Sequence, residues 1–182
     1  MKRRDISLTR RFGIALCTLL VAAIAFHAQV ASALVTRGDD AMRAGNQTLA
    51  IAFYRRAVTL DPAAQTPADR LAFNLLLRHT PDDAQSAIDI ASGALRRHPD
   101  DVPLLVDRAL GEQRLGHWKT AENDFARAGK IAKDPRYEHF AGRIALKRGH
   151  RAAAFRHFQA AVADDPRFAP ARVALQSMRQ RQ

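Results

Sequence analysis

A stripe of basic side chains near the C-terminus is the part of this sequence best suited to binding chemistry. Its members step along the chain by three, four and four residues, so a helix places them on one face: Arg136, His139, Arg143 and Lys147. Arginine forks and lysine ammonium groups bind carboxylates, and a cationic face steers acidic partners towards it. The pattern fits an ordinary solvated helix face equally well.

The positive charge of the chain is concentrated around this basic stripe. The 182 residues carry a formal charge of +11. Residues 34–135 contain 14 basic and 14 acidic residues, whereas residues 136–182 contain 10 basic and 3 acidic ones. This asymmetry favours an acidic protein partner or anionic lipid headgroups. Nucleic acid is disfavoured, because no aromatic residues interleave with the stripe and export would remove the chain from it.

No catalytic or cofactor motif is present in the sequence. It lacks a glycine-rich phosphate loop, a G-x-S-x-G turn and an H-E-x-x-H zinc motif. One cysteine, Cys17, allows neither a disulfide within the chain nor a cysteine-based zinc site. His150 and His157 are not spaced as metal ligands on a helix, so we interpret the histidines as exposed helix or turn residues. We expect no enzyme activity, metal or cofactor.

A sparse pattern that occurs four times indicates the elements that position the stripe. Its copies are Gly45-Ala50-Tyr54-Ala57, Asp82-Ala87-Ala91-Ala94, Gly116-Ala121-Phe125-Ala128 and Gly149-Ala154-Phe158-Ala161. Alanines around a large residue predict closely packed helices, and glycine predicts a left-handed helix end. The period is 33 or 34 residues except for a first step of 37, which we assign to a loop insertion at Gln65-Thr66-Pro67.

This pattern resembles the tetratricopeptide repeat (TPR) family, most specifically in AGNQTLAIAFYRRAVTLDP (44–62) and RGHRAAAFRHFQAAVADDP (148–166). The resemblance implies an all-α solenoid over residues 34–166, because a single helical hairpin cannot bury its own apolar face. The expected copies span about 34–64, 68–101, 102–134 and 135–166, followed by a capping helix at 167–182. The second copy departs from the family pattern, since Asp82 stands in place of the turn glycine.

In TPR proteins the first helix of each pair lines a concave groove that binds peptides. The resemblance implies that the basic stripe faces this groove, together with residues of earlier copies: Leu110, Gln113, Arg114, Met42 and Arg43. The asparagines of the chaperone-binding carboxylate clamp are missing, so that specificity is not implied. Trp118 falls where the family has an aromatic packing residue, and we expect it in the core.

Residues 1–33 are expected to be a targeting segment that leads to export. Five basic residues among the first eleven precede an uncharged stretch at 12–36. Basic residues in this position keep the N-terminus in the cytoplasm. Ala31-Ser32-Ala33 fits a signal-peptide cleavage site, yet the uncharged stretch is long enough to remain as a transmembrane anchor. The repeats are then periplasmic or secreted, or anchored with membrane contact through 12–36.

The favoured function is a non-catalytic scaffold of the cell envelope that binds an acidic partner segment in the groove. The alternative is a structural subunit packed permanently in a membrane-associated complex or a homo-oligomer. An exposed apolar groove around Val106, Leu110 and Leu146 would favour the first function, and a stoichiometric complex on purification would favour the second.

Overall fold

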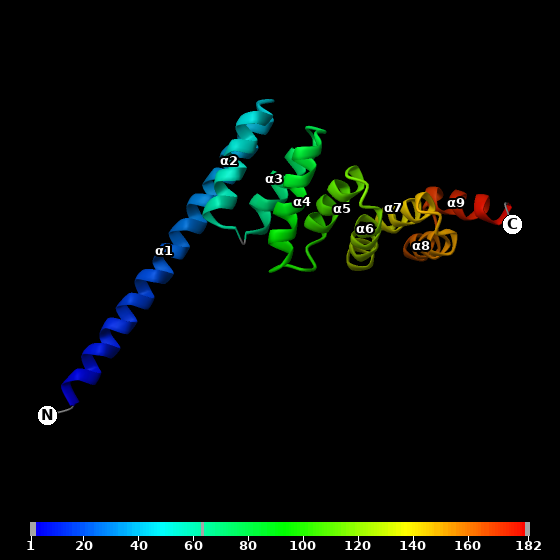
Figure 1. Ribbon diagram of the computed structural model, residues 1–182. Helices are drawn as coiled ribbons and strands as arrows, with labels where there is room; N and C mark the ends of the chain where they lie inside the picture. The colour runs from blue at the N-terminus through cyan, green and yellow to red at the C-terminus, as the bar shows by residue number, and fades with distance from the viewer. Residues whose placement is uncertain (1–2, 63, 181–182) are drawn as a thin grey trace. The chain divides into compact units, whose positions relative to one another are not determined.

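The computed structural model describes residues 3–62 and 64–180, and all regular elements in these ranges are α-helices (Figure 1). The chain divides into two compact units, Met1–Pro62 and Ala63–Gln182. The first unit contains α1 (Arg3–Arg43) and α2 (Gln47–Leu60). The second contains α3 (Gln65–Leu76), α4 (Pro81–Leu95), α5 (Val102–Arg114), α6 (Trp118–Ala132), α7 (Pro135–Lys147), α8 (Arg151–Asp164) and α9 (Ala169–Gln180).

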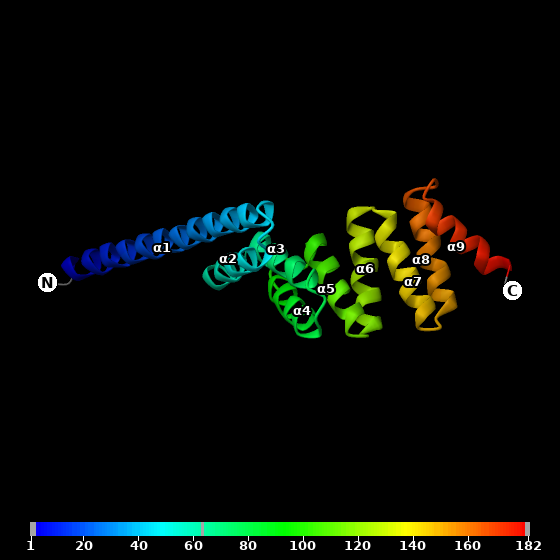
Figure 2. The ribbon, with the colours of Figure 1, turned by 90° about the horizontal axis from the view of Figure 1, so that it is seen from above.

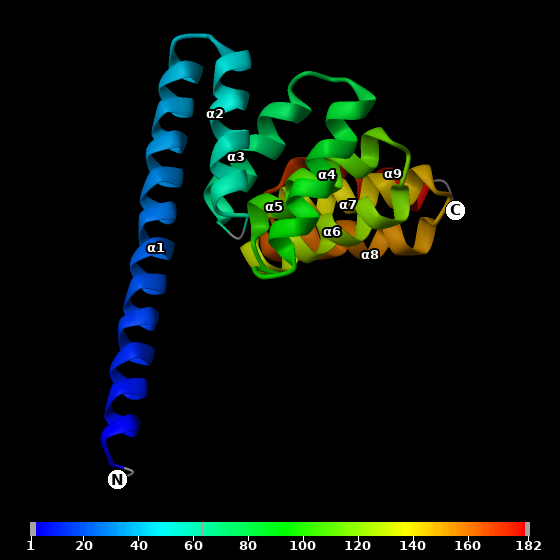
Figure 3. The same cartoon turned by 60° about the vertical axis from the view of Figure 1, so that its left-hand side comes forward.

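The first unit is a helical hairpin with one very long arm. Helix α2 packs against the C-terminal part of α1, as Figure 3 shows. Gly38 lets the Tyr54 ring lie directly on α1, and the Tyr54 hydroxyl donates to Asp39 at 2.6 Å. The expected first helix of the first repeat is therefore the C-terminal end of α1, continuous with the apolar targeting segment.

Glycines end the first helix of three repeats, as the sequence predicts. Gly45, Gly116 and Gly149 have φ values of 76°, 82° and 78°, in the left-handed region that glycine adopts without a Cβ clash. The prediction of Asp82 as the corresponding residue of the second copy is wrong. His79 has a φ of 60° there, and α4 begins at Pro81 after Thr80, whose hydroxyl accepts from the Asp83 amide at 3.1 Å.

The packing frame of the second copy consequently lies three residues earlier than predicted. Ala84, Ile88 and Ala91 are buried at the places of the alanine, aromatic and alanine of the other copies. The loop insertion at Gln65-Thr66-Pro67 is also wrong, because these residues form the first turn of α3. The longer connection instead follows α4, at residues 96–101.

The second unit is an α-solenoid in which each helix packs on the next from α3 to α9 (Figure 2). Fully buried alanines allow close helix approach around large side chains such as Leu104, Phe125 and Phe158. Helix α9 caps the end as expected, because Ala171 and Met178 are buried and Phe168 and Leu175 pack beside them.

Charged pairs tie neighbouring helices of the second unit together. Arg108 of α5 donates two hydrogen bonds of 2.7 Å to Asp124 of α6. His157 of α8 lies between Glu138, at 2.8 Å, and Glu122, which also pairs with Arg148. His157 is thus not the exposed histidine that the sequence suggested, since its partners come from α6 and α7.

Candidate functional site

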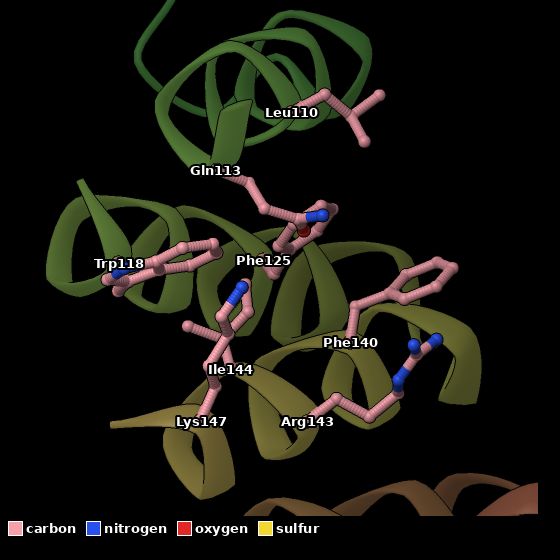
Figure 4. Close-up of a pocket in the computed structure, with 8 residues that line it drawn as sticks. All are labelled: Leu110, Gln113, Trp118, Phe125, Phe140, Arg143, Ile144 and Lys147. Atoms are coloured by element: carbon pink, nitrogen blue, oxygen red, sulfur yellow. The ribbon is translucent and has the colours of Figure 1, made fainter. Parts of the chain in front are cut away.

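A pocket of about 220 Å³ lies between α5, α6 and α7 in the second unit. Figure 4 shows the side chains around it, which come from all three helices: Leu110, Gln113, Trp118, Phe125, Phe140, Arg143, Ile144 and Lys147. Helices α5 and α7 are the first helices of the third and fourth repeats, and α6 is the second helix of the third. The pocket therefore lies where two consecutive repeats meet.

One wall of the pocket is apolar. Phe125 and Ile144 are buried members of one core cluster, and Leu110 packs against that cluster. The Phe140 ring lies 5.4 Å from the Phe125 ring, centroid to centroid, and is 38% exposed. An exposed phenylalanine beside buried apolar side chains forms an apolar surface, and covering such a surface with a ligand is favourable in free energy.

Two cations extend from α7 to the pocket (Figure 4). The Lys147 ammonium lies 3.8 Å from the centre of the Trp118 ring, a cation–π contact. Arg143 is exposed, and no carboxylate within residues 3–62 and 64–180 forms an ion pair with either cation. Gln113 adds an amide that donates and accepts hydrogen bonds. The arrangement places two cationic groups and an amide beside an apolar surface.

The structure thus brings together four of the predicted site residues: Leu110, Gln113, Arg143 and Lys147. Arg114 does not line the pocket, because its guanidinium donates to the Leu76 carbonyl at the end of α3. Arg136 binds the Asp134 carboxylate through Nε at 2.9 and 3.0 Å. This hydrogen bonding lowers the pKa of Asp134. Arg43 belongs to the first unit and pairs with Asp40.

His139 lies on the basic stripe but contacts a different set of side chains. Its ring is 5.6 Å from that of Phe158 and 5.7 Å from that of Phe168, centroid to centroid. Burial and, to a lesser degree, the neighbouring Arg143 charge lower the pKa of His139, so the imidazole is neutral at pH 7. Of the four residues of the stripe, only Arg143 and Lys147 therefore line the pocket.

Trp118, Phe125, Phe140 and Ile144 were not predicted as site residues. Trp118 packs against the core cluster as expected, but its ring also lines the pocket and carries Lys147. A signal for this contact was present in the repeats. The first turn of α6 lies beside the last turn of α7, which places Trp118, just after Gly116, near Lys147, just before Gly149.

The described residues contain no group of three or more His, Cys, Asp or Glu side chains arranged to hold a metal ion.

Comparisons with known proteins identify the fold. No protein-family model matches the chain, and no curated protein matches it. The solved structure of the MamA protein superposes with a TM-score of 0.73 at 14% identity, over 84% of this chain and 82% of that one. A tetratricopeptide repeat protein from Parabacteroides merdae gives 0.69 at 19% identity, over 84% and 61%.

YrrB, described as a TPR protein with an unusual peptide-binding site, gives a TM-score of 0.66 at 20% identity, over 80% of this chain and 74% of that one. Likeness at these identities establishes architecture rather than activity. The fold of this chain is the tetratricopeptide repeat fold, as the sequence pattern predicts.

Proposed function

We propose that this chain is a non-catalytic scaffold whose second unit binds a segment of a partner protein. The second unit recognises an acidic side chain of that segment. The observation that carries the proposal is the pair of cations, Arg143 and Lys147, beside an apolar pocket. Other arginines of the unit, such as Arg108 and Arg148, are neutralised by carboxylates of the chain itself. Arg143 has no such partner among the described residues, so its fork remains available to a ligand.

The two cations have different tasks in this proposal. Lys147 already interacts with Trp118, and such contacts contribute about 0.5–1 kcal/mol at exposed sites. Arg143 is the primary carboxylate ligand, and Lys147 adds a second charge while it keeps the Trp118 ring in place. The apolar pocket accepts a neighbouring aliphatic side chain, so the preferred segment combines an acidic residue with an apolar one.

The setting that we propose is the cell envelope. It is supported by the N-terminal helix of the described chain, which is long and apolar enough to cross a membrane or to act as a signal sequence. The binding of a partner segment, rather than its location, is supported by the fold, because the similar protein YrrB is described as a TPR protein with an unusual peptide-binding site. The partner is a protein that reaches the same compartment.

Trp118 is the one tryptophan of the chain, so its fluorescence reports directly on the pocket. We would titrate the chain with the peptide Gly-Gly-Leu-Glu-Glu-Gly at low salt and follow the Trp118 emission. The glutamine version of the peptide should bind at least tenfold more weakly, because it lacks the charge that Arg143 recognises.

Charge reversal provides the matched test. Arg143→Glu with Lys147→Glu should abolish the response to the glutamate peptide. Lys119→Glu with Lys130→Glu changes the net charge equally on exposed positions of α6 outside the pocket and should retain it. Equal binding by both double variants would refute the proposed site. A stoichiometric complex that survives high salt in both would favour the permanent structural subunit instead.

A further inference from the structure

The part of α1 from Gly13 to Phe26 is apolar and exposed on every side. All residues from 13 to 29 are exposed, and seven large apolar side chains between Ile14 and Phe26 are each 57–70% accessible. A helix that packs against protein on one side needs only one apolar stripe. A helix that is apolar on every side is instead suited to surroundings that are apolar on every side. Lipid provides such surroundings.

The length of this surface matches one bilayer. Burial begins at Ala31, and the part of the uncharged stretch that precedes it covers 12–30 in the sequence. Nineteen helical residues rise about 28 Å, close to the roughly 30 Å of a hydrocarbon core. Five basic residues in the first eleven positions precede it, which is the arrangement of a cytoplasmic flank.

The predicted cleavage site is flanked by buried residues of α1. Ala31 is 3% exposed, and Leu34 and Val35 are also buried, where α1 packs against α2. Ser32 and Ala33 are exposed, but both lie in the body of the same uninterrupted helix. Proteolysis requires a locally unfolded backbone, so cutting after Ala33 requires the hairpin to open and removes Ala31 from its packing.

We propose that residues 12–30 are a retained transmembrane anchor whose occupant is the lipid bilayer, and that the Ala31-Ser32-Ala33 pattern stays uncut because it is part of the first hairpin. The anchor continues without a break into the first repeat helix, so no flexible linker separates the repeat from the membrane. Helix α2 runs back along α1, and its C-terminal end is the end nearest the bilayer (Figure 3). This anchoring is independent of what the pocket of the second unit binds.

Cys17 provides a direct test, because it is the one cysteine of the chain and lies on the N-terminal side of Ala33. The full chain is expressed in a bacterial host, and fractions are denatured and treated with a maleimide. We expect one labelled thiol per chain, a mass of 20.1 kDa and resistance of the membrane-bound chain to alkaline extraction. An unlabelled, shorter chain that begins at Leu34 would overturn the proposal, and Cys17→Ser controls the labelling.

A second variant tests why the site is uncut. Insertion of Gly-Ser-Gly-Ser between Ala33 and Leu34 interrupts the helix and separates the cleavage pattern from the hairpin. We expect this chain to be processed and to lose its thiol. If it keeps the thiol, packing does not protect the site and that part of the proposal is wrong. Release of the uncut chain by alkali as a soluble oligomer would assign the helix to self-association and refute the lipid anchor.

Discussion

Asp107 is the residue whose surroundings least suit its ordinary charge. Its side chain on α5 is 4% exposed, and Oδ2 has no hydrogen-bond partner within the described chain. Burial and, to a lesser degree, the charges of Asp69 and Asp101 together raise the pKa of Asp107 to about 8. The folded chain therefore holds a proton on this carboxyl group at neutral pH.

The proton on Asp107 makes stability depend on pH. The unfolded chain releases it near 3.8 and the folded chain near 8, so the stabilising contribution is complete below the lower value and is lost as pH rises to the higher one. The free energy of unfolding should fall by as much as about 1 kcal/mol per pH unit in this window. Urea unfolding of the chain in neutral detergent, followed by circular dichroism, measures it.

Asp107→Asn should flatten this dependence and stabilise the fold at pH 8. Asp89→Asn is the matched control, because Asp89 lies exposed on α4 and should leave the slope as in the parent chain. The same slope in all three chains would show that Asp107 is already ionised in the folded state.

At the level of helices, close approach depends on the absence of a Cβ at particular glycines. A Cβ on Gly142 of α7 would lie 2.5 Å from Cε1 and 2.8 Å from Cδ1 of Phe158 on α8. On Gly93 of α4, the nearest atom to such a Cβ is an Arg96 guanidinium nitrogen at 3.8 Å. Gly142 is therefore required for close helix packing, whereas Gly93 is not.

Gly142→Ala should lower the free energy of unfolding by about 1–3 kcal/mol, because the added methyl group overpacks the α7–α8 contact. Gly93→Ala should raise it by about 0.5–1 kcal/mol, since alanine favours the helix and nothing obstructs its side chain. The midpoints of urea unfolding compare the two, and a stabilised Gly142→Ala chain would contradict this packing.

The turn of the second repeat offers a related comparison. His79 adopts the left-handed conformation that glycine adopts at Gly149. We expect Gly149→Ala to destabilise the fold by about 1 kcal/mol, the cost of a Cβ in that region. His79→Gly should remove such strain and stabilise the fold by about 0.5 kcal/mol. This gain is smaller than the cost of Gly149→Ala because glycine also increases the conformational entropy of the unfolded chain. Thermal unfolding of both chains checks the opposite signs.

For the molecule as a whole, the lipid anchor proposed above governs where the chain resides. Val21 lies near the middle of the exposed apolar segment. Val21→Arg places a charge at the bilayer centre, which costs about 2.5–3.5 kcal/mol during insertion. We expect the fraction of chain resistant to alkaline extraction to fall severalfold. Thr36→Arg, on an exposed position beyond the segment, should leave that fraction unchanged.

Much of the fold follows from local sequence. Gly45, Gly116 and Gly149 adopt the predicted conformation, because a helix end requires a residue that tolerates positive φ. The predicted packing frame of the second repeat is wrong because α4 has buried alanines at 84, 87, 91 and 94, which satisfy two frames three residues apart. Thr80 and Pro81 form a typical helix start, and this start distinguishes the two frames.

The candidate site was less accessible to sequence reasoning. The helical period correctly places Arg143 and Lys147 on one face of a helix. It also groups Arg136 and His139 with them, because all four residues follow the same helical spacing. Backbone period assigns a side chain to a helix face but does not say which neighbours it meets. Arg136 hydrogen-bonds to the nearby carboxylate of Asp134, and the His139 ring packs against those of Phe158 and Phe168.

The amino-acid pattern thus sufficed for the all-helical repeat architecture and the apolar N-terminal helix, because helix ends, packing stripes and long apolar runs depend on residues close together in the chain. The pocket and the burial of Ala31 required the packed structure. Trp118 meets Lys147 across two helices, and Ala31 is covered by a helix that begins sixteen residues later. Such contacts depend on how side chains from separate helices share the same space, which no local pattern encodes.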